Sequence, residues 1–391
     1  MKQIISCYLT CGILLLLVAS ISFNLDTQEI IAHNPNNWPT EDWLVSTPEE
    51  QNMNQEYLDA MLQYIEDEEY SVDSILLIRN GYLVFEEYFN GWDETGIHQL
   101  FSVTKSVISC LIGIAVEEGL LEINQTVLSF FPDKVIDNLD VDKQNITIEH
   151  LLTMSSGLSW IEAIHDGIGF SSDDPVQYIL DRPMVAAPGE EFNYNSGNAH
   201  LLSAILQNVT GQSTLNYAQE KLFDYLGIDN LSWDIDAQGI YFGGHGLSLC
   251  SQDMAKFGFL YLNNGTWDGY QVIPEDWVEA SITKYTYTVD SADYGYLFWL
   301  YPEFDHYAAQ GFMGQRILIF PKYDFIAIVT SPSYSTVYLI PILVSDFLLP
   351  SLNEYPYTPT TTTQSNSVIM FSSIIVIFTI IYQTRKEKIR K

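Results

Sequence analysis

The stretch LFSVTKSVISCLIGIAVEEG, residues 100–119, places a serine and a lysine three positions apart at the start of an apolar segment. Within residues 102–118 apolar side chains recur at three- and four-residue spacing, which is typical of an amphipathic helix, and Gly119 suits its end. Because residues three apart on a helix are surface neighbours, we expect Ser102 and Lys105 on one face. The pair is then either a nucleophile with its base or two polar residues on a helix surface.

The spacing alone is weak evidence, because Ser281 and Lys284 repeat it. Ser102, however, starts its helix, where free backbone N–H groups and the helix dipole can stabilise an oxyanion, whereas Ser281 closes a helical pattern. To act as a base, Lys105 must lose its proton, so its pKa must fall from about 10.4 by roughly 3 units, or about 4 kcal/mol. The apolar helix around Lys105 predicts enough burial for that fall.

Strand patterns stand at both ends of the chain. SILLIRNGYLVFEEYF, from Ser74, has two β-rich runs joined by Asn80-Gly81, a strong hairpin signal. GQRILIFPKYDFIAIVTS, from Gly314, has two more around the turn at 321–324, and VYLIPILVSDFLL offers a closing helix. Residues 120–232 alternate short helical patterns with loops. We therefore expect an α+β fold, with an antiparallel sheet flanked by helices and a mostly helical insertion.

Composition excludes several classes of function. Of the 391 residues 47% are hydrophobic, which supplies a core and argues against extensive disorder. The net charge of −34 argues against nucleic acid and anionic membrane surfaces as partners of the chain's body. Only Cys110 and Cys250 lie outside the leading apolar segment, and no metal-ligand spacing occurs. We expect no disulfide framework, no metal and no cofactor.

Both ends of the chain are apolar. Residues 1–24 predict a secretory signal or an uncleaved anchor, and residues 367–383 predict a membrane-spanning helix. The basic tail, 384–391, fits the cytoplasmic side, and the Thr- and Pro-rich residues 356–366 predict a stalk. The body, residues 25–355, would then face outward on a membrane anchor. A buried core helix is the alternative for the last apolar segment, but a terminal cluster of like charges argues against it.

A loop rich in Gly, Asn and Ser, PGEEFNYNSGNA, leads into another helical pattern and carries Tyr194 and Ser196. A tyrosine in such a loop is suited to relay protons. The alternative is a loop tyrosine that caps a neighbouring element, which is the more common use of any single tyrosine.

Five blocks occur along the chain: LFSVTKSVISCLIGIAVEEGLLE, ITIEHLLTMSSGLSW, FNYNSGNAHLLSAILQNVTG, GLSLCSQDMAKFGFLYLNNGTWDGYQVIPEDWV and AAQGFMGQRILIFP. In this order and at these separations, over about residues 40–350, they resemble the serine β-lactamase and penicillin-binding-protein superfamily. The resemblance is greatest to its class C-like branch of esterases and 6-aminohexanoate-dimer hydrolases. It implies that Ser102 is the acylated nucleophile, Lys105 its base and Tyr194 the proton shuttle. Whether Lys105 or Tyr194 takes the first proton stays open.

The third motif of the superfamily, Lys-Thr-Gly or His-x-Gly on an edge strand, falls on Ala309-Gln310-Gly311. The resemblance implies that the N–H of Phe312 joins that of Ser102 in an oxyanion hole. The motif's cation, which would hold the carboxylate of a penicillin or a D-Ala-D-Ala peptide, is missing. We therefore expect poor turnover of such anions and a preference for neutral or cationic esters or amides, as small molecules or peptides.

Substrate contacts are expected from Ser196, which stands where the lactamase pattern has Asn, and from Gln310 and Gly311. Trp160 and His245 are further candidates. For Trp160 the alternative is a packing role, and for His245 it is a loop histidine bonded to the backbone.

The sequence thus predicts a membrane-anchored, extracytoplasmic serine hydrolase, an esterase or amidase that forms an acyl-enzyme on Ser102. One alternative is an inactive binding or sensor module, against which the retention of Ser102, Lys105 and Tyr194 argues. The other is a D-Ala-D-Ala carboxypeptidase- or transpeptidase-like cell-wall enzyme, which the missing cation disfavours.

Overall fold

The computed structural model describes residues 38–288 and 292–356. The expected signal or anchor, the membrane helix and the basic tail lie outside these residues, as does the stalk apart from Pro356. Within the described ranges, no helix combines the length and the apolar character that a bilayer span requires.

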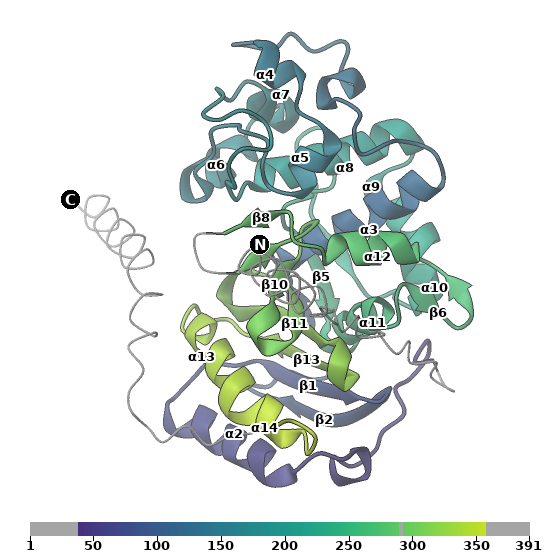
Figure 1. The fold of residues 1–391 in the computed structure, drawn as a ribbon, viewed down its shortest axis with the longest axis vertical. Coiled ribbons are helices and arrows are strands. Elements are labelled where there is room, and N and C mark those ends of the chain that lie inside the picture. Colours follow the sequence, from purple (N-terminus) through teal and green to yellow (C-terminus); the bar gives the residue numbers. More distant parts are fainter. Residues whose placement is uncertain (1–37, 289–291, 357–391) are drawn as a thin grey trace, which may run out of the picture. The chain divides into compact units, whose positions relative to one another are not determined.

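An eight-stranded antiparallel sheet organises the described region (Figure 1), in the order β2-β1-β13-β12-β11-β10-β9-β8. β1, from the beginning of the described region, pairs with β13, from near its end, which confirms that distant parts of the chain complete one sheet. The strands of this sheet are β1 (Ser74–Arg79), β2 (Tyr82–Tyr88), β8 (Thr286–Tyr287), β9 (Asp293–Tyr294), β10 (Trp299–Tyr301), β11 (His306–Gln310), β12 (Arg316–Phe320) and β13 (Phe325–Thr330).

The expected turns lie where the sequence places them. Asn80 and Gly81 join β1 to β2 with φ angles of 50° and 79°, the left-handed pair that suits a two-residue hairpin. Between β12 and β13, a 3₁₀ turn over Pro321–Tyr323 ends at Asp324, and Phe320 pairs with Phe325.

Two cores lie on the two faces of the sheet, because side chains alternate along each strand. On β1, Ile75 and Leu77 belong to one core, whereas Leu76 and Ile78 belong to the other. The smaller core also contains Leu58 of α2 and residues of the C-terminal helices, while the larger one contains α3, α8 and α11.

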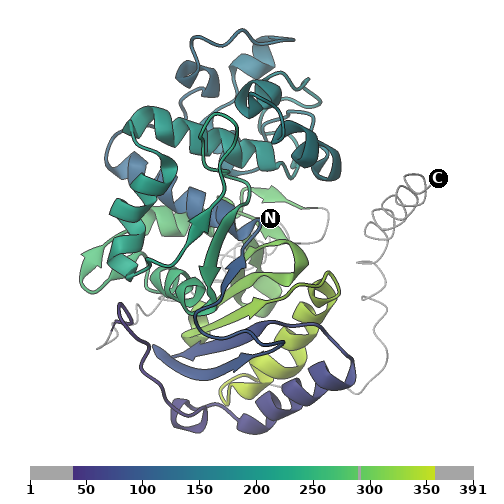
Figure 2. The ribbon, with the colours of Figure 1, turned by 180° about the vertical axis from the view of Figure 1, so that it is seen from behind.

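The helices cover both faces of the sheet. In Figures 1 and 2, α2, α13 and α14 lie together on one face, and the mostly helical region of α4 to α9 lies beyond the other. Among the described residues the helices are α2 (Gln55–Asp67), α3 (Val103–Glu117), α4 (Val141–Gln144), α5 (Ile148–Leu152), α6 (Glu162–Gly169), α7 (Pro175–Leu180), α8 (Ser196–Thr210), α9 (Thr214–Ala218), α10 (Asp224–Leu226), α11 (Ser251–Leu262), α12 (Glu275–Ser281), α13 (Thr336–Ile342) and α14 (Leu349–Ser351).

Two small sheets complete the fold. The first joins β3 (Ile97–Gln99), β5 (Leu247–Cys250) and β4 (Ser232–Trp233), and β3 leads directly into α3. The second joins β6 (Thr266–Trp267) and β7 (Tyr270–Gln271). The closing helix is not one regular helix, because a π-helical turn over Leu343–Leu348 separates α13 from α14.

Helix α3 differs from the amphipathic helix that its sequence predicts. Every residue from Val103 to Ala115 is buried, including Ser106 and Ser109 on the polar side. The Ser106 hydroxyl donates to Leu297 O at 2.8 Å. The polar side is buried because the helix lies between the main sheet and the helical region. Among the described residues Ser106 has a partner inside the protein, whereas the Ser109 hydroxyl has none.

Candidate active site

Ser102 stands at the junction between β3 and α3. The N–H groups of Val103 and Thr104 donate to Leu100 O and Phe101 O, so the helix begins with a tight turn. Phe101 has a φ of 48°, a left-handed conformation that costs a non-glycine residue roughly 1–3 kcal/mol. Such a local cost is common where the backbone is shaped around a reactive group.

Lys105 lies one turn into α3, and its side chain is only 1% exposed. Its Nζ is 2.9 Å from Ser102 Oγ, 2.8 Å from Ser196 Oγ and 2.7 Å from Gly244 O. These three acceptors match the three donors of an ammonium group. The structure therefore brings Ser102 and Lys105, at the start of α3, together with Ser196 of α8. Lys105 and Ser196 are 91 residues apart in the sequence.

The expected fall in the pKa of Lys105 is wrong in direction. Burial is the largest single influence and lowers it, but the electrostatic interactions with Tyr194, Glu162 and Asp166 together outweigh burial and raise the pKa of Lys105 above its ordinary value. Glu162 Oε1 lies 4.0 Å from Nζ. The sequence argument counted the apolar helix around Lys105 but not the two carboxylates that face it from α6.

Tyr194 lies beside Lys105, as the sequence predicts. Its ring centroid is 4.8 Å from Lys105 Nζ, and its ring packs 5.7 Å from that of Trp299 on β10. Burial raises the pKa of Tyr194, against the opposing effects of the Lys105 charge and of hydrogen bonds with Ser102 and Lys105. The phenol is therefore protonated at neutral pH and has Ser102 and Lys105 as its hydrogen-bond partners.

Glu162 reaches the site from the first residue of α6. Its Oε2 accepts from Trp160 Nε1 at 2.6 Å and from Ser196 N at 3.1 Å, and its Oε1 accepts the Ser196 hydroxyl. Burial and the charge of Glu162 raise the pKa of Asp166, one turn further along α6, to about 7. The i, i+4 spacing of the two acids in the sequence was the available signal for this pair.

Trp160 is 4% exposed, and its indole N–H is committed to Glu162. This burial favours the packing role of Trp160 over a direct contact with substrate. The Ser196 side chain is 1% exposed and bonded to Lys105 and Glu162. The contacts observed for Trp160 and Ser196 are thus with the protein's own polar groups.

The loop Gly243–His245 closes another side of the site. A Cβ on Gly244 would lie 2.8 Å from Ser196 Cβ, and one on Gly243 would lie 2.0 Å from Ala199 O. Only glycine lets this loop lie against the start of α8, which brings Gly244 O to Lys105. The His245 ring packs 5.0 Å from that of Phe170, and burial, with the nearby Lys105 charge, lowers the pKa of His245 to about 4.

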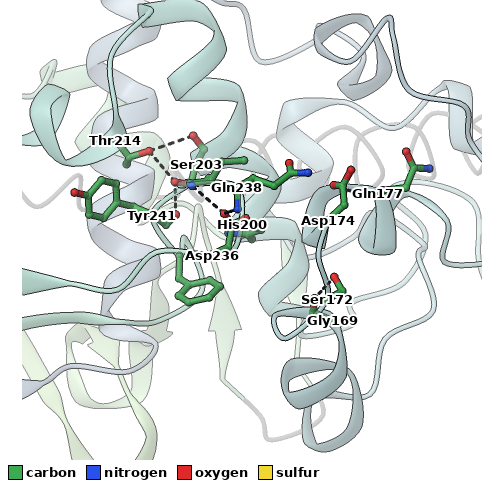
Figure 3. A network of polar contacts seen from close by, with 12 residues as sticks. Gly169, Ser172, Asp174, Gln177, His200, Ser203, Thr214, Asp236, Gln238 and Tyr241 are labelled. Atoms are coloured by element: carbon green, nitrogen blue, oxygen red, sulfur yellow. Dashed lines mark hydrogen bonds and ion pairs between the residues drawn. The ribbon is translucent and has the colours of Figure 1, made fainter.

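A buried polar network behind the site fixes α8 to the segment that precedes this loop (Figure 3). His200 Nε2 is 3.0 Å from Asp236 Oδ2, and Asp236 Oδ1 accepts the backbone N–H groups of Gln238 and Ile240. From the next turn of α8, the Ser203 hydroxyl donates to Tyr241 O at 2.7 Å. These contacts hold Ser196 and Gly244 in register.

The third motif, Ala309-Gln310-Gly311, spans the last two residues of β11 and the residue that follows it. A Cβ on Gly311 would lie 2.1 Å from Leu100 O, so this strand end touches the residues just before Ser102. Gln310 is paired in the sheet with Arg316 of β12, and its Nε2 lies 2.5 Å from the Tyr301 hydroxyl. The side chain of Gln310 is thus directed to the protein's own tyrosine.

Arg316 was not singled out in the sequence, yet it is a buried cation close to the motif that lacks one. Its Nη1 donates to Gly311 O at 2.6 Å and to Gln315 O at 2.8 Å. Burial lowers the pKa of Arg316 to about 10, which still leaves it charged at neutral pH. With 6% of its surface exposed, the guanidinium holds the turn after Gly311.

The second Ser-x-x-Lys match has a different setting. The Ser281 hydroxyl donates to Trp277 O at 2.7 Å, and Lys284 Nζ lies 2.8 Å from Asp293 Oδ1. Each residue serves its own local partner. Among the described residues, no group of His, Cys, Asp and Glu side chains is arranged to hold a metal ion.

The fold and the site together define a β-lactamase/transpeptidase-like protein. The beta-lactamase family profile matches residues 59–336, and the chain belongs to this family. Over 240 residues it is 26% identical to the 6-aminohexanoate-dimer hydrolase of Paenarthrobacter ureafaciens. The match covers 57% of this chain and 61% of that protein. It is 29% identical to Protein flp of Staphylococcus aureus over 155 residues, or 37% of this chain and 31% of that protein.

The chain therefore spans less than two thirds of the length of these curated relatives. Among solved structures, the octameric penicillin-binding protein homologue from Pyrococcus abyssi is similar with a TM-score of 0.63 and 22% identity. That similarity covers 77% of this chain and 78% of the other, and it shows the shared fold. The chain is thus a member of the beta-lactamase family whose fold is shared by a penicillin-binding protein homologue.

Proposed function

We propose that this protein is a membrane-anchored, extracytoplasmic esterase or amidase that works through an acyl-enzyme on Ser102. The observation that carries the proposal is the 2.9 Å contact between the buried Lys105 Nζ and Ser102 Oγ at the start of α3. A nucleophilic serine needs a proton acceptor within hydrogen-bond reach, and in the proposal this acceptor is the neutral form of Lys105, a minor species at neutral pH because the pKa of Lys105 is raised.

In the proposed reaction Ser102 Oγ attacks the carbonyl carbon of the substrate while its proton passes to Lys105 or Tyr194. The N–H groups of Ser102 and Phe312 receive the developing oxyanion. The C–O or C–N bond to the leaving group then breaks, and the leaving group takes the proton through Tyr194. A water molecule attacks the acyl-enzyme by the same path in reverse, releasing the acid and restoring Ser102.

Substrate choice is proposed from the charges around the site. Glu162 and Asp166 bring negative charge to within reach of Lys105, and Arg316, a cation near the third motif, is buried against backbone carbonyls. This arrangement supports neutral or cationic esters and amides over penicillins and D-Ala-D-Ala peptides, whose carboxylates would meet the acidic side.

The test is covalent labelling of the purified full-length chain with a fluorophosphonate and, separately, with a fluorescent penicillin, read by intact mass. We expect a fluorophosphonate adduct that disappears in Ser102→Ala. The absence of both adducts would refute the proposal in favour of a binding or sensor module. Slow-releasing penicillin labelling would replace it with a carboxypeptidase- or transpeptidase-like enzyme.

A further inference from the structure

Glu162 stands at the end of a chain of polar contacts that begins at the nucleophile. Ser102 Oγ, Lys105 Nζ, Ser196 Oγ and Glu162 Oε1 follow one another, and each neighbouring pair is within hydrogen-bond distance. The last group is a carboxylate, which when ionised can only accept. The Ser196 hydroxyl must therefore give its hydrogen to Glu162, and its oxygen is left as an acceptor toward Lys105.

This direction matters when Lys105 is neutral. A neutral amine has two donors and one lone pair. Gly244 O, at 2.7 Å, takes one donor, and Ser196 Oγ, at 2.8 Å, takes the other because its own hydrogen is committed. The lone pair then faces the hydroxyls of Ser102 and Tyr194, the two groups that must exchange protons with it.

We propose that Glu162 is a positioning residue for acylation, and that it acts through Ser196 to direct the lone pair of neutral Lys105 toward Ser102. The inference rests on the proposed function, since it assigns to Glu162 a role in the same acylation step. Glu162 itself touches neither the nucleophile nor, in the proposed reaction, the substrate carbonyl.

The contacts of Glu162 define what an amide would do in its place. Its Oε2 accepts from two donors, Trp160 Nε1 and Ser196 N, so the oxygen of a glutamine must occupy that position. The amide nitrogen then faces Ser196 Oγ and donates to it. The Ser196 hydrogen turns toward Lys105 and occupies the lone pair that Ser102 needs.

Other charges also act on Lys105 and must be considered in any pH profile. The titratable and charged groups that face it or its partner Tyr194 are Glu162 and Asp166 of α6, Tyr194 before α8, His245 of the glycine loop, Tyr294 of β9 and Arg316 of β12. The charge of Glu162 raises the pKa of Lys105. Its removal shifts the rising limb of the profile to lower pH.

The experiment measures the second-order rate of fluorophosphonate labelling of the full-length chain between pH 6 and 11. Glu162→Gln is expected to move the rising limb to lower pH and to reduce the plateau rate about tenfold or more, since a tenfold loss corresponds to one weakened hydrogen bond of about 1.4 kcal/mol. Glu191→Gln, at an exposed carboxylate, is the matched control and should change neither quantity.

The decisive variant is the double substitution. In a Ser196→Ala background there is no hydroxyl to reverse, so Glu162→Gln should leave the plateau unchanged within about twofold. An equal loss with and without Ser196 would overturn the inference, as would an unchanged plateau in Glu162→Gln alone. If the wild-type protein is not labelled at Ser102, the proposed function itself is refuted. That result can be told apart from the two results that would overturn only the role of Glu162.

A second substitution covers the case in which Glu162→Gln does not fold. Trp160→Phe removes the indole N–H that holds Oε2 but leaves the carboxylate charge in place. It should lower the plateau by a smaller factor with no shift of the rising limb. A plateau in Trp160→Phe equal to that of wild type would reject the positioning role of Glu162.

Discussion

The contact between Arg316 and the turn after β11 gives the most direct test of how the fold shapes the site. Arg316 donates to Gly311 O and Gln315 O from one buried nitrogen, and Gly311 lies against Leu100, two residues before Ser102. Arg316→Met keeps most of the side-chain stem and removes both bonds. The turn that carries the N–H of Phe312, the expected second oxyanion donor, then loses its anchor.

The expected magnitude has two parts. A hydrogen bond to a charged group is worth about 1.5–3 kcal/mol, and relief of the buried charge offsets some of the loss, so we expect the free energy of unfolding to fall by about 2–4 kcal/mol. Loss of one oxyanion donor costs about 10²–10³-fold in rate. Because Arg316→Met displaces the N–H of Phe312 without removing it, we expect the labelling rate to fall by about 10- to 100-fold.

The assay combines urea unfolding with the fluorophosphonate labelling rate at a pH where wild type is at its plateau. Arg79→Met is the matched control, because Arg79 is also a buried arginine of the main sheet, paired with Glu354 away from Ser102. It should lower stability while the labelling rate stays within about twofold of wild type. The reasoning is refuted if Arg316→Met is labelled as fast as wild type, or if both variants slow labelling equally.

Three further outcomes follow from the site and its supports. Gly244→Ala should reduce the labelling rate about 10- to 100-fold, because the added Cβ would lie 2.8 Å from Ser196 Cβ and move the carbonyl that accepts from Lys105. The control Gly167→Ala, which has open space around the added Cβ, should change the rate by less than about twofold. Equal labelling rates for the two variants would contradict this prediction. Ser281→Ala should leave fluorophosphonate labelling intact while Ser102→Ala abolishes it, as read by intact mass, and persistence of the adduct in Ser102→Ala would assign the nucleophile elsewhere. Burial raises the pKa of Asp236, but hydrogen bonds from His200, Ile240 and Gln238 outweigh burial and hold the pKa below the ordinary 3.8, so the stabilisation is present above that value and is lost as the pH falls through the folded pKa. Asp236→Asn should therefore lower the free energy of unfolding by about 1–3 kcal/mol at pH 7, and the difference in urea midpoint between the variant and wild type should shrink below about pH 4. A difference that stays constant down to about pH 2 would argue against this mechanism.

Local sequence patterns determined much of this protein. Alternation along residues 74–88 and 314–331, with Asn80-Gly81 and the turn at 321–324 between the runs, predicts the four adjacent strands β2, β1, β13 and β12 of the sheet, because side-chain period and turn chemistry act over a few residues. The spacing of Ser102 and Lys105 predicts their contact for the same reason, since both lie on one turn of α3.

Only the tertiary structure decided the electrostatics of the site. The charge state of Lys105 depends on Glu162 and Asp166, which lie about 60 residues away in sequence and reach it because α6 packs beside α8. The third motif lacks a cation in the sequence, but the structure places Arg316 beside it, because Arg316 of β12 pairs with Gln310 of β11. The Arg316 guanidinium nevertheless donates to backbone carbonyls. A pKa is set by all charges within a few ångströms, and no pattern of neighbouring residues along the chain contains them.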